Sequence, residues 1–141
     1  MIKVEDLRIG DIVRVCCDCE FSEGTVCTVS EIGIINIIEE RKGIVSLIPI
    51  NGINDNSLEV WCSDIEGIPL TPEILKKNGW ISYKKLPLSY EHKGYRFGVE
   101  FQSHSELVSV SIGLMIFHRF KYIHELQHIL WALGIDTEFK I

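Results

Sequence analysis

The first 67 residues of this chain consist almost entirely of short runs rich in valine and isoleucine, separated by clusters of Gly, Asn and Asp at hairpin intervals. Such runs favour β-strands, and breaks at this spacing are typical of antiparallel hairpins. We expect strands over five ranges: Ile12–Cys19, Thr25–Ile34, Ile35–Glu39, Ile44–Ile50 and Leu58–Cys62. The turns between them are expected at Ser22–Gly24, Arg41–Gly43, Asn51–Gly52 and Asn54–Ser57. Residues 1–67 are thus predicted to form a small curved antiparallel β-sheet or a partly open barrel.

The pattern changes at Ile68–Glu73. Thr71 can cap a helix, Pro72 suits its first turn and Gly79 can end it, which predicts a short helix over residues 72–78. Further strands are expected over Trp80–Leu86, Tyr95–Gln102 and Glu106–Ile112, whereas Leu114–Phe117 fits either a strand or the entry to a last helix. The sequence therefore predicts an α+β protein with a second lobe over residues 68–141, and we expect the two lobes to form one cooperative unit.

A C-terminal amphipathic helix is predicted from Phe120 to Leu133. At 100° per residue, a broad apolar arc is formed by Phe120, Ile123, Leu126, Ile129, Leu130, Trp131 and Leu133. The narrow polar side is formed by Lys121, His124, Glu125 and His128, which we expect to face solvent. Gly134 is expected to end this helix, and residues 138–141 to add a short tail strand.

Charge and hydropathy exclude several classes of protein. The formal net charge of the 141 residues is −6, and acidic residues are spread along the chain, so nonspecific nucleic-acid binding is disfavoured. The charged start of the chain predicts no secretory signal. Apolar stretches such as Ile112–Phe117 are much shorter than the roughly 20 residues that cross a bilayer. We expect a cytoplasmic protein without a membrane partner.

The five cysteines are an odd number, which fits reduced thiols in a cytosolic protein. Three of them lie close together, at Cys16, Cys17 and Cys19. Zinc sites space paired cysteines by two to four residues, so this cluster favours small buried side chains over a metal or redox site.

The segment from His124 to His128 reads H-E-x-x-H, the pattern of the metal-binding helix of zinc peptidases. That chemistry needs two histidines one turn apart as ligands and a glutamate, here Glu125, that activates the metal-bound water. A third ligand is missing from the usual downstream position, which is Gly134. A ligand from upstream stays open, and the candidates are His92, His104 and His118.

Three stretches carry a resemblance: Asp6–Asp11, Ile68–Leu75 with Asn78–Trp80, and Lys121–Gln127 with Ala132–Gly134. The chain resembles a large group of short proteins of gut anaerobic bacteria and of their phages and mobile elements. The resemblance implies no activity and transfers no ligand. Members of the group typically have glutamine at the position of Glu125 and asparagine at that of His128, which implies a structural role for His124.

Because no complete catalytic set is present, we expect a small non-enzymatic interaction or regulatory module of mobile-element or phage type, with an unidentified protein as partner and no cofactor. The alternative is a zinc-dependent hydrolase with His124 and His128 as metal ligands and Glu125 as general base. A regulator of transcription or phage defence is a third class, which no residue supports. Apolar edge strands in the first half are also compatible with a homodimer.

Overall fold

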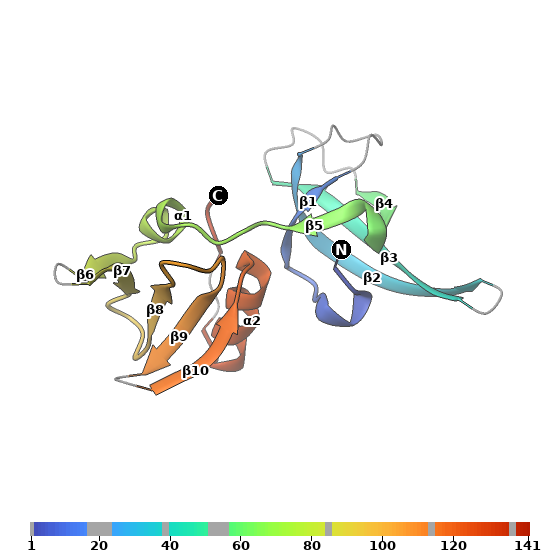
Figure 1. Cartoon of the computed structure of the whole chain (residues 1–141). Helices are drawn as coiled ribbons and strands as arrows, with labels where there is room; N and C mark the ends of the chain where they lie inside the picture. The colour runs from blue at the N-terminus through green and yellow to red at the C-terminus, as the bar shows by residue number, and fades with distance from the viewer. Residues whose placement is uncertain are drawn as a thin grey trace. The chain divides into compact units, whose positions relative to one another are not determined.

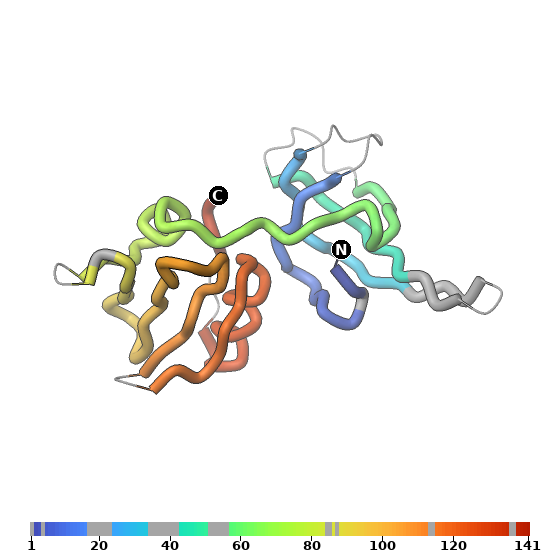
Figure 2. Tube along the Cα trace, viewed as in Figure 1, coloured from blue at the N-terminus to red at the C-terminus, as the bar shows by residue number. Residues whose placement is uncertain are grey.

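The structure is a computed structural model that describes residues 2–16, 24–37, 40–50, 57–83, 86–112, 115–135 and 138–141. The chain divides into two compact units, Met1–Ile68 and Pro69–Ile141. Each unit contains its own five-stranded antiparallel sheet, and the second unit adds two helices (Figures 1 and 2). The predicted α+β class is therefore confirmed. Cooperative unfolding of the two units stays a prediction.

The N-terminal unit is a five-stranded antiparallel sheet preceded by a short 3-10 turn, η1 (Val4–Asp6). Its strand order is β4-β3-β2-β1-β5. The strands are β1 (Ile12–Val15), β2 (Val26–Ile37), β3 (Glu40–Pro49), β4 (Leu58–Trp61) and β5 (Ile65–Gly67). One turn of 3-10 helix, η2 (Cys62–Asp64), connects the two edge strands β4 and β5.

This short connection requires the sheet to curve. In a flat sheet of five strands, spaced by about 4.8 Å, the edges would be about 19 Å apart. A 3-10 turn rises only about 2 Å per residue, so η2 cannot span that distance. Among the described residues no pairing joins β4 to β5, so the sheet is curved and open, as predicted for residues 1–67.

The core of this unit consists of small apolar side chains on the inner face of the curved sheet. Among them Val13, Val29 and Val45 are completely buried. Val15 lies opposite Ile65 in the pairing of β1 with β5, and both are also fully buried. The three-residue strand β5 therefore completes the core.

Two predictions for this unit are wrong. The range Ile35–Glu39 is not a separate strand, because β2 continues to Ile37, which pairs with Glu40. The predicted turn Arg41–Gly43 lies within β3, where each residue has a partner in β2. The β-branched run keeps β2 extended through Gly33, and a single glycine between long basic residues does not end β3. The expected turns at 51–52 and 54–56 and the expected strand residues 17–19 lie outside the described residues.

The C-terminal unit is an antiparallel meander, in the order β10-β9-β8-β7-β6. It starts with the helix α1 (Pro72–Lys77), close to the predicted range. The strands are β6 (Ile81–Tyr83), β7 (Leu86–Glu91), β8 (Gly98–Phe101), β9 (Val108–Ile112) and β10 (Met115–Phe120). The helix α2 (Ile123–Ala132) follows and lies against the sheet beside β9 and β10 (Figure 1).

Three expectations for this unit need correction. The predicted strand Trp80–Leu86 is divided between β6 and the start of β7, and the rest of β7 was not predicted. Residues 115–117 form strand and not the entry to the last helix. The helix α2 begins at Ile123, because Phe120 ends β10. Residues 138–141 form no strand.

The tail is nevertheless held by hydrogen bonds to the end of α1. The side chain of Asn78 accepts a bond from the main-chain N–H of Lys140 and donates to its carbonyl oxygen, both at 2.8 Å. The same amide nitrogen donates to the carbonyl oxygen of Ile74, also at 2.8 Å. Phe139 is buried beside this contact. Asn78 therefore provides hydrogen bonds to the main chain of the tail that a neighbouring strand would otherwise provide.

In the parts of the chain that the structure describes, no helix is long and apolar enough to cross a membrane.

Candidate functional site

The H-E-x-x-H segment lies in the first turns of α2, and its glutamate is used as a helix cap. The Oε2 atom of Glu125 accepts hydrogen bonds from the main-chain N–H groups of Lys121 and Tyr122, both at 2.9 Å. These two groups precede the first turn of α2, where main-chain donors lack intrahelical partners. Glu125 is thus directed towards the start of the helix.

The two histidines differ in environment, contrary to the expectation that both face solvent. His124 is only 3% exposed, whereas His128 is half-buried. The ring of His124 stacks on Tyr122 with centroids 5.7 Å apart, and the ring of His128 stacks on Trp131 at the same distance. The predicted solvent side of α2 is therefore wrong for His124.

The buried face of α2 is turned relative to the predicted apolar arc. It contains Ile123, His124, Leu126, Gln127 and Leu130, whereas Leu133 of the predicted arc is exposed. The helix begins three residues later than predicted, so Phe120 packs from β10 instead. His124 and Gln127 are therefore buried, at positions outside the predicted apolar arc.

Among the described residues, no third ligand accompanies His124 and His128. The rings of His124 and His128 are 5.9 Å apart and lie edge to face, and Glu125 caps the helix. The search of the described residues finds no group of three or more His, Cys, Asp or Glu side chains able to hold a metal. Of the upstream candidates, His118 and His104 are exposed.

The remaining candidate, His92, belongs to an aromatic cluster. Its ring stacks on Tyr95 with centroids 4.1 Å apart, and its Nδ1 accepts a hydrogen bond of 3.1 Å from the main-chain N–H of Gly94. Trp80 packs on the same two rings and on Phe97. This cluster braces the turn between β7 and β8.

The described cysteines do not form a reactive site. Cys27 and Cys62 are buried in the N-terminal core, and burial raises the pKa of the Cys62 thiol. Cys16 is exposed, but partial burial and the charges of Glu66 and Asp64 raise the pKa of its thiol as well. Cys17 and Cys19, the rest of the predicted cluster, lie outside the described residues.

A different surface has the form of a binding site: the face of the C-terminal sheet opposite its buried face. The strand registers place one row of side chains across this open face, namely Ile81, Glu91, Gly98, Ser111 and Ile116. A second row on the same face contains Ser89, Glu100, Ser109 and Arg119, of which Ser109 is buried and accepts a hydrogen bond from the side chain of Gln102. Tyr90, Val99 and Val110 pair across the other face and are buried. The open face is therefore polar along its centre.

Small side chains make this open face hollow. The hollow, called the trough below, has a volume of about 480 Å³, and its floor includes Ser89, Gly98 and Ser111. A Cβ atom at Gly98 would lie 3.3 Å from the main-chain oxygen of Tyr90 and 3.7 Å from Oγ of Ser111. The missing side chain of Gly98 therefore provides part of the depth.

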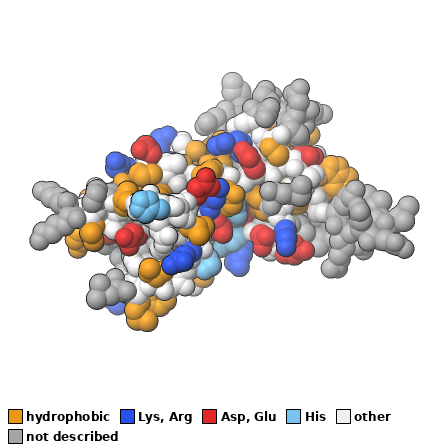
Figure 3. Space-filling model, in the orientation of Figure 1, with side chains coloured by type: hydrophobic (Ala, Val, Ile, Leu, Met, Phe, Trp, Pro, Cys, Tyr) orange, Lys and Arg blue, Asp and Glu red, His pale blue; other side chains and the backbone are white. Residues whose placement is uncertain are grey.

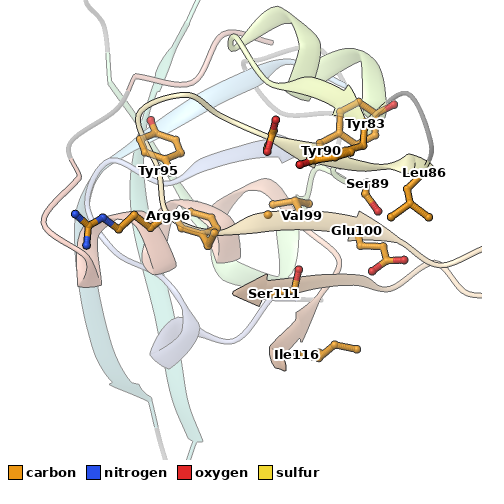
Figure 4. Close-up of a pocket in the computed structure, with 13 residues that line it drawn as sticks. Tyr83, Leu86, Ser89, Tyr90, Tyr95, Arg96, Val99, Glu100, Ser111 and Ile116 are labelled. Atoms are coloured by element: carbon orange, nitrogen blue, oxygen red, sulfur yellow. The ribbon is translucent and has the colours of Figure 1, made fainter. Parts of the chain in front are cut away.

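Apolar side chains form the two rims. Leu86 is 57% exposed and Ile116 is 53% exposed, and they lie on opposite sides of Glu100 in Figure 4. Exposed hydrophobic side chains gather at both ends of this sheet in the face shown in Figure 3. An apolar rim around polar groups is typical of ligand and partner sites.

Three charged side chains line the trough. Glu91, Glu100 and Arg96 line it, and in the part of the chain that the structure describes no ion pair involves any of them. The Arg96 side chain extends away from Glu100 and Ser111 (Figure 4). The floor of the trough is thus acidic.

The trough was not predicted from the sequence, although a signal is present. In β7, β8 and β9, small or acidic residues alternate with Tyr90, Val99 and Val110. Period-two alternation indicates a sheet with one face exposed to solvent. The alternation does not predict the strand register that brings Glu91, Gly98 and Ser111 side by side.

A scan against models of protein families finds no match, and searches of curated proteins and of solved structures find none either.

Proposed function

We propose that this chain is a small non-enzymatic interaction module that binds an extended segment of a partner protein in the trough of its C-terminal sheet. The observation that carries the proposal is the uncovered, hollow face of this sheet, whose opposite face is buried. The volume of about 480 Å³ falls within the range of about 300–1,000 Å³ that ligand sites have.

Extended peptide is the occupant that matches the shape and chemistry of the trough. The rims carry Leu86 and Ile116, which offer contacts to apolar side chains of a ligand, and the floor carries hydroxyl and carboxylate oxygens. Peptide recognition commonly combines apolar pockets with a few placed polar groups.

Catalysis has less support at this surface. A serine nucleophile needs a base within hydrogen-bond reach. Neither Ser89 nor Ser111 has a hydrogen bond to a histidine or a carboxylate among the described residues. The polar groups of the trough therefore suit binding.

The test is selection of binders from a random peptide display library against the whole chain, followed by affinity measurement with purified peptides. Ser111→Phe should fill the trough, because the Oγ of Ser111 faces the space above Gly98. We expect this variant to bind selected peptides at least about tenfold more weakly, a loss of about 1.4 kcal/mol.

The matched control is Ser57→Phe, the same change at an exposed serine of the N-terminal unit. It should bind like the unmodified chain, and both variants should keep the unmodified circular dichroism spectrum. Selection that yields no peptide, or peptides that bind Ser111→Phe unchanged, would overturn the proposal.

A further inference from the structure

We infer that the trough selects a basic side chain, lysine or arginine, in the partner segment, held by the carboxylates of Glu91 and Glu100 above Gly98. This inference rests on the proposed function and specifies the chemistry of its ligand.

The strand registers place the two carboxylates around one point. Glu91 lies directly opposite Gly98 in the neighbouring strand, and Glu100 lies two residues after Gly98 on the same face of β8. Residues in this diagonal relationship have backbone positions about 7–8 Å apart, within reach of long side chains. The two glutamates can therefore contact one cationic group above Gly98.

A hydroxyl group lies on the other side of Gly98 from Glu91. Ser111 lies opposite Gly98 on the other side, and its Oγ is 3.7 Å from the position of a Cβ at Gly98. Ammonium and guanidinium groups are donors only, with three and five N–H groups. A hollow that offers two carboxylates and a hydroxyl matches these donors.

Among the described residues, no basic side chain forms an ion pair with either carboxylate. Arg96 extends away from Glu100, and no ion pair to Glu91 or Glu100 occurs in the described ranges. The formal charge of −6 adds attraction for a basic partner at long range. Charge complementarity therefore favours a basic segment.

The apolar rims distinguish a basic side chain from a bare cation. Lysine and arginine carry aliphatic stems that pack on apolar surface while the charged end makes polar contacts. Leu86 and Ile116 are exposed on either side of the acidic floor. An inorganic cation would leave these side chains without contact.

The experiment uses an arginine-containing peptide from the selection and measures its affinity for the whole chain by fluorescence anisotropy. The double variant Glu91→Gln with Glu100→Gln keeps the shape of the trough and removes its charge. We expect it to bind at least about tenfold more weakly, because hydrogen bonds between charged groups are the strong ones. The control Glu59→Gln with Glu138→Gln, at exposed glutamates outside the trough, should bind like the unmodified chain.

On the peptide side, arginine is replaced by citrulline, which has nearly the same shape and no charge. The citrulline peptide should lose a similar factor in affinity for the unmodified chain. The double variant should bind both peptides with nearly the same affinity, which would support the inference. Peptides that bind in the trough but carry no basic residue, or that bind the double variant unchanged, overturn it while the proposed function stands. N-acetylarginine amide binding as tightly as the peptide would assign the site to small cations and overturn a peptide as its occupant. A selection that yields no peptide overturns both proposals.

Discussion

Glu125 accepts a hydrogen bond from the main-chain N–H of Tyr122, 2.9 Å away, across the first turn of α2. The same oxygen accepts from Lys121, so one carboxylate satisfies two donors at the start of the helix. Glu125, the acidic residue of the H-E-x-x-H motif, thus has a structural role as a helix cap. The consequences are measurable in stability and in metal content.

Replacing Glu125 should destabilise the protein without affecting peptide binding. Glu125→Ala removes the acceptor for two main-chain donors, and loss of a helix cap costs about 1 kcal/mol. Glu125→Gln keeps an acceptor oxygen and should cost less. Urea unfolding measures both, with Glu138→Ala at an exposed position as control. Equal stability of Glu125→Ala and the control would contradict the cap.

The two histidines should differ strongly when each is replaced by alanine. His124 is 3% exposed on the buried face of α2, so His124→Ala leaves a cavity and should cost about 2 kcal/mol. His128 is half-buried, and His128→Ala should cost less than about 1 kcal/mol. Thermal unfolding of the two variants provides the comparison. The reverse order of stability would show that the orientation of α2 is wrong.

Zinc should bind the purified protein far below one equivalent. No third His, Cys, Asp or Glu side chain joins the two histidines among the described residues, and Glu125 accepts hydrogen bonds as a helix cap, so the ligand set of a catalytic zinc site is incomplete there. Atomic emission analysis after exposure to zinc measures the content, and His128→Ala is the comparison. One equivalent that His128→Ala removes would support the alternative hydrolase.

Asn78 should control the attachment of the tail. Asn78→Ala removes two hydrogen bonds to Lys140 and one to Ile74, and we expect a loss of about 1–2 kcal/mol. Asn78→Asp keeps the acceptor for the N–H of Lys140 but places a carboxylate oxygen against the carbonyl oxygens of Ile74 and Lys140, so it should cost at least as much as Asn78→Ala. Hydrogen exchange of the Lys140 amide reports the attachment, and it should accelerate in Asn78→Ala. Unchanged exchange in Asn78→Ala would mean that the tail is held by other contacts.

Local signals in the sequence are sufficient for some elements. Thr71 accepts a hydrogen bond from the main-chain N–H of Ile74, Pro72 starts α1, and Gly79 follows it with a φ of +82°. These residues act within one turn of helix, so their effect does not depend on the rest of the fold. The range of α1 was accordingly predicted almost correctly.

Elements that depend on tertiary pairing could not be placed from the sequence. The three residues of β5 are too few for a pattern, and only their pairing with β1, in which Ile65 lies opposite Val15, makes them a strand. The start of α2 is set by Phe120, which pairs with Val108 and thereby stays in β10. The candidate site has the same limitation, because the proximity of Glu91, Gly98 and Ser111 follows from the registers of three strands.

The central claim is that the trough binds a basic peptide, and a nuclear magnetic resonance titration tests it most directly. The uniformly ¹⁵N-labelled chain is titrated with an arginine-containing peptide from the selection, and the amide shifts are followed. The largest changes should occur at Gly98, Glu100 and Ser111, and the citrulline peptide should cause much smaller ones. Changes centred on α2 or on the N-terminal sheet, with the trough amides unmoved, would contradict the claim.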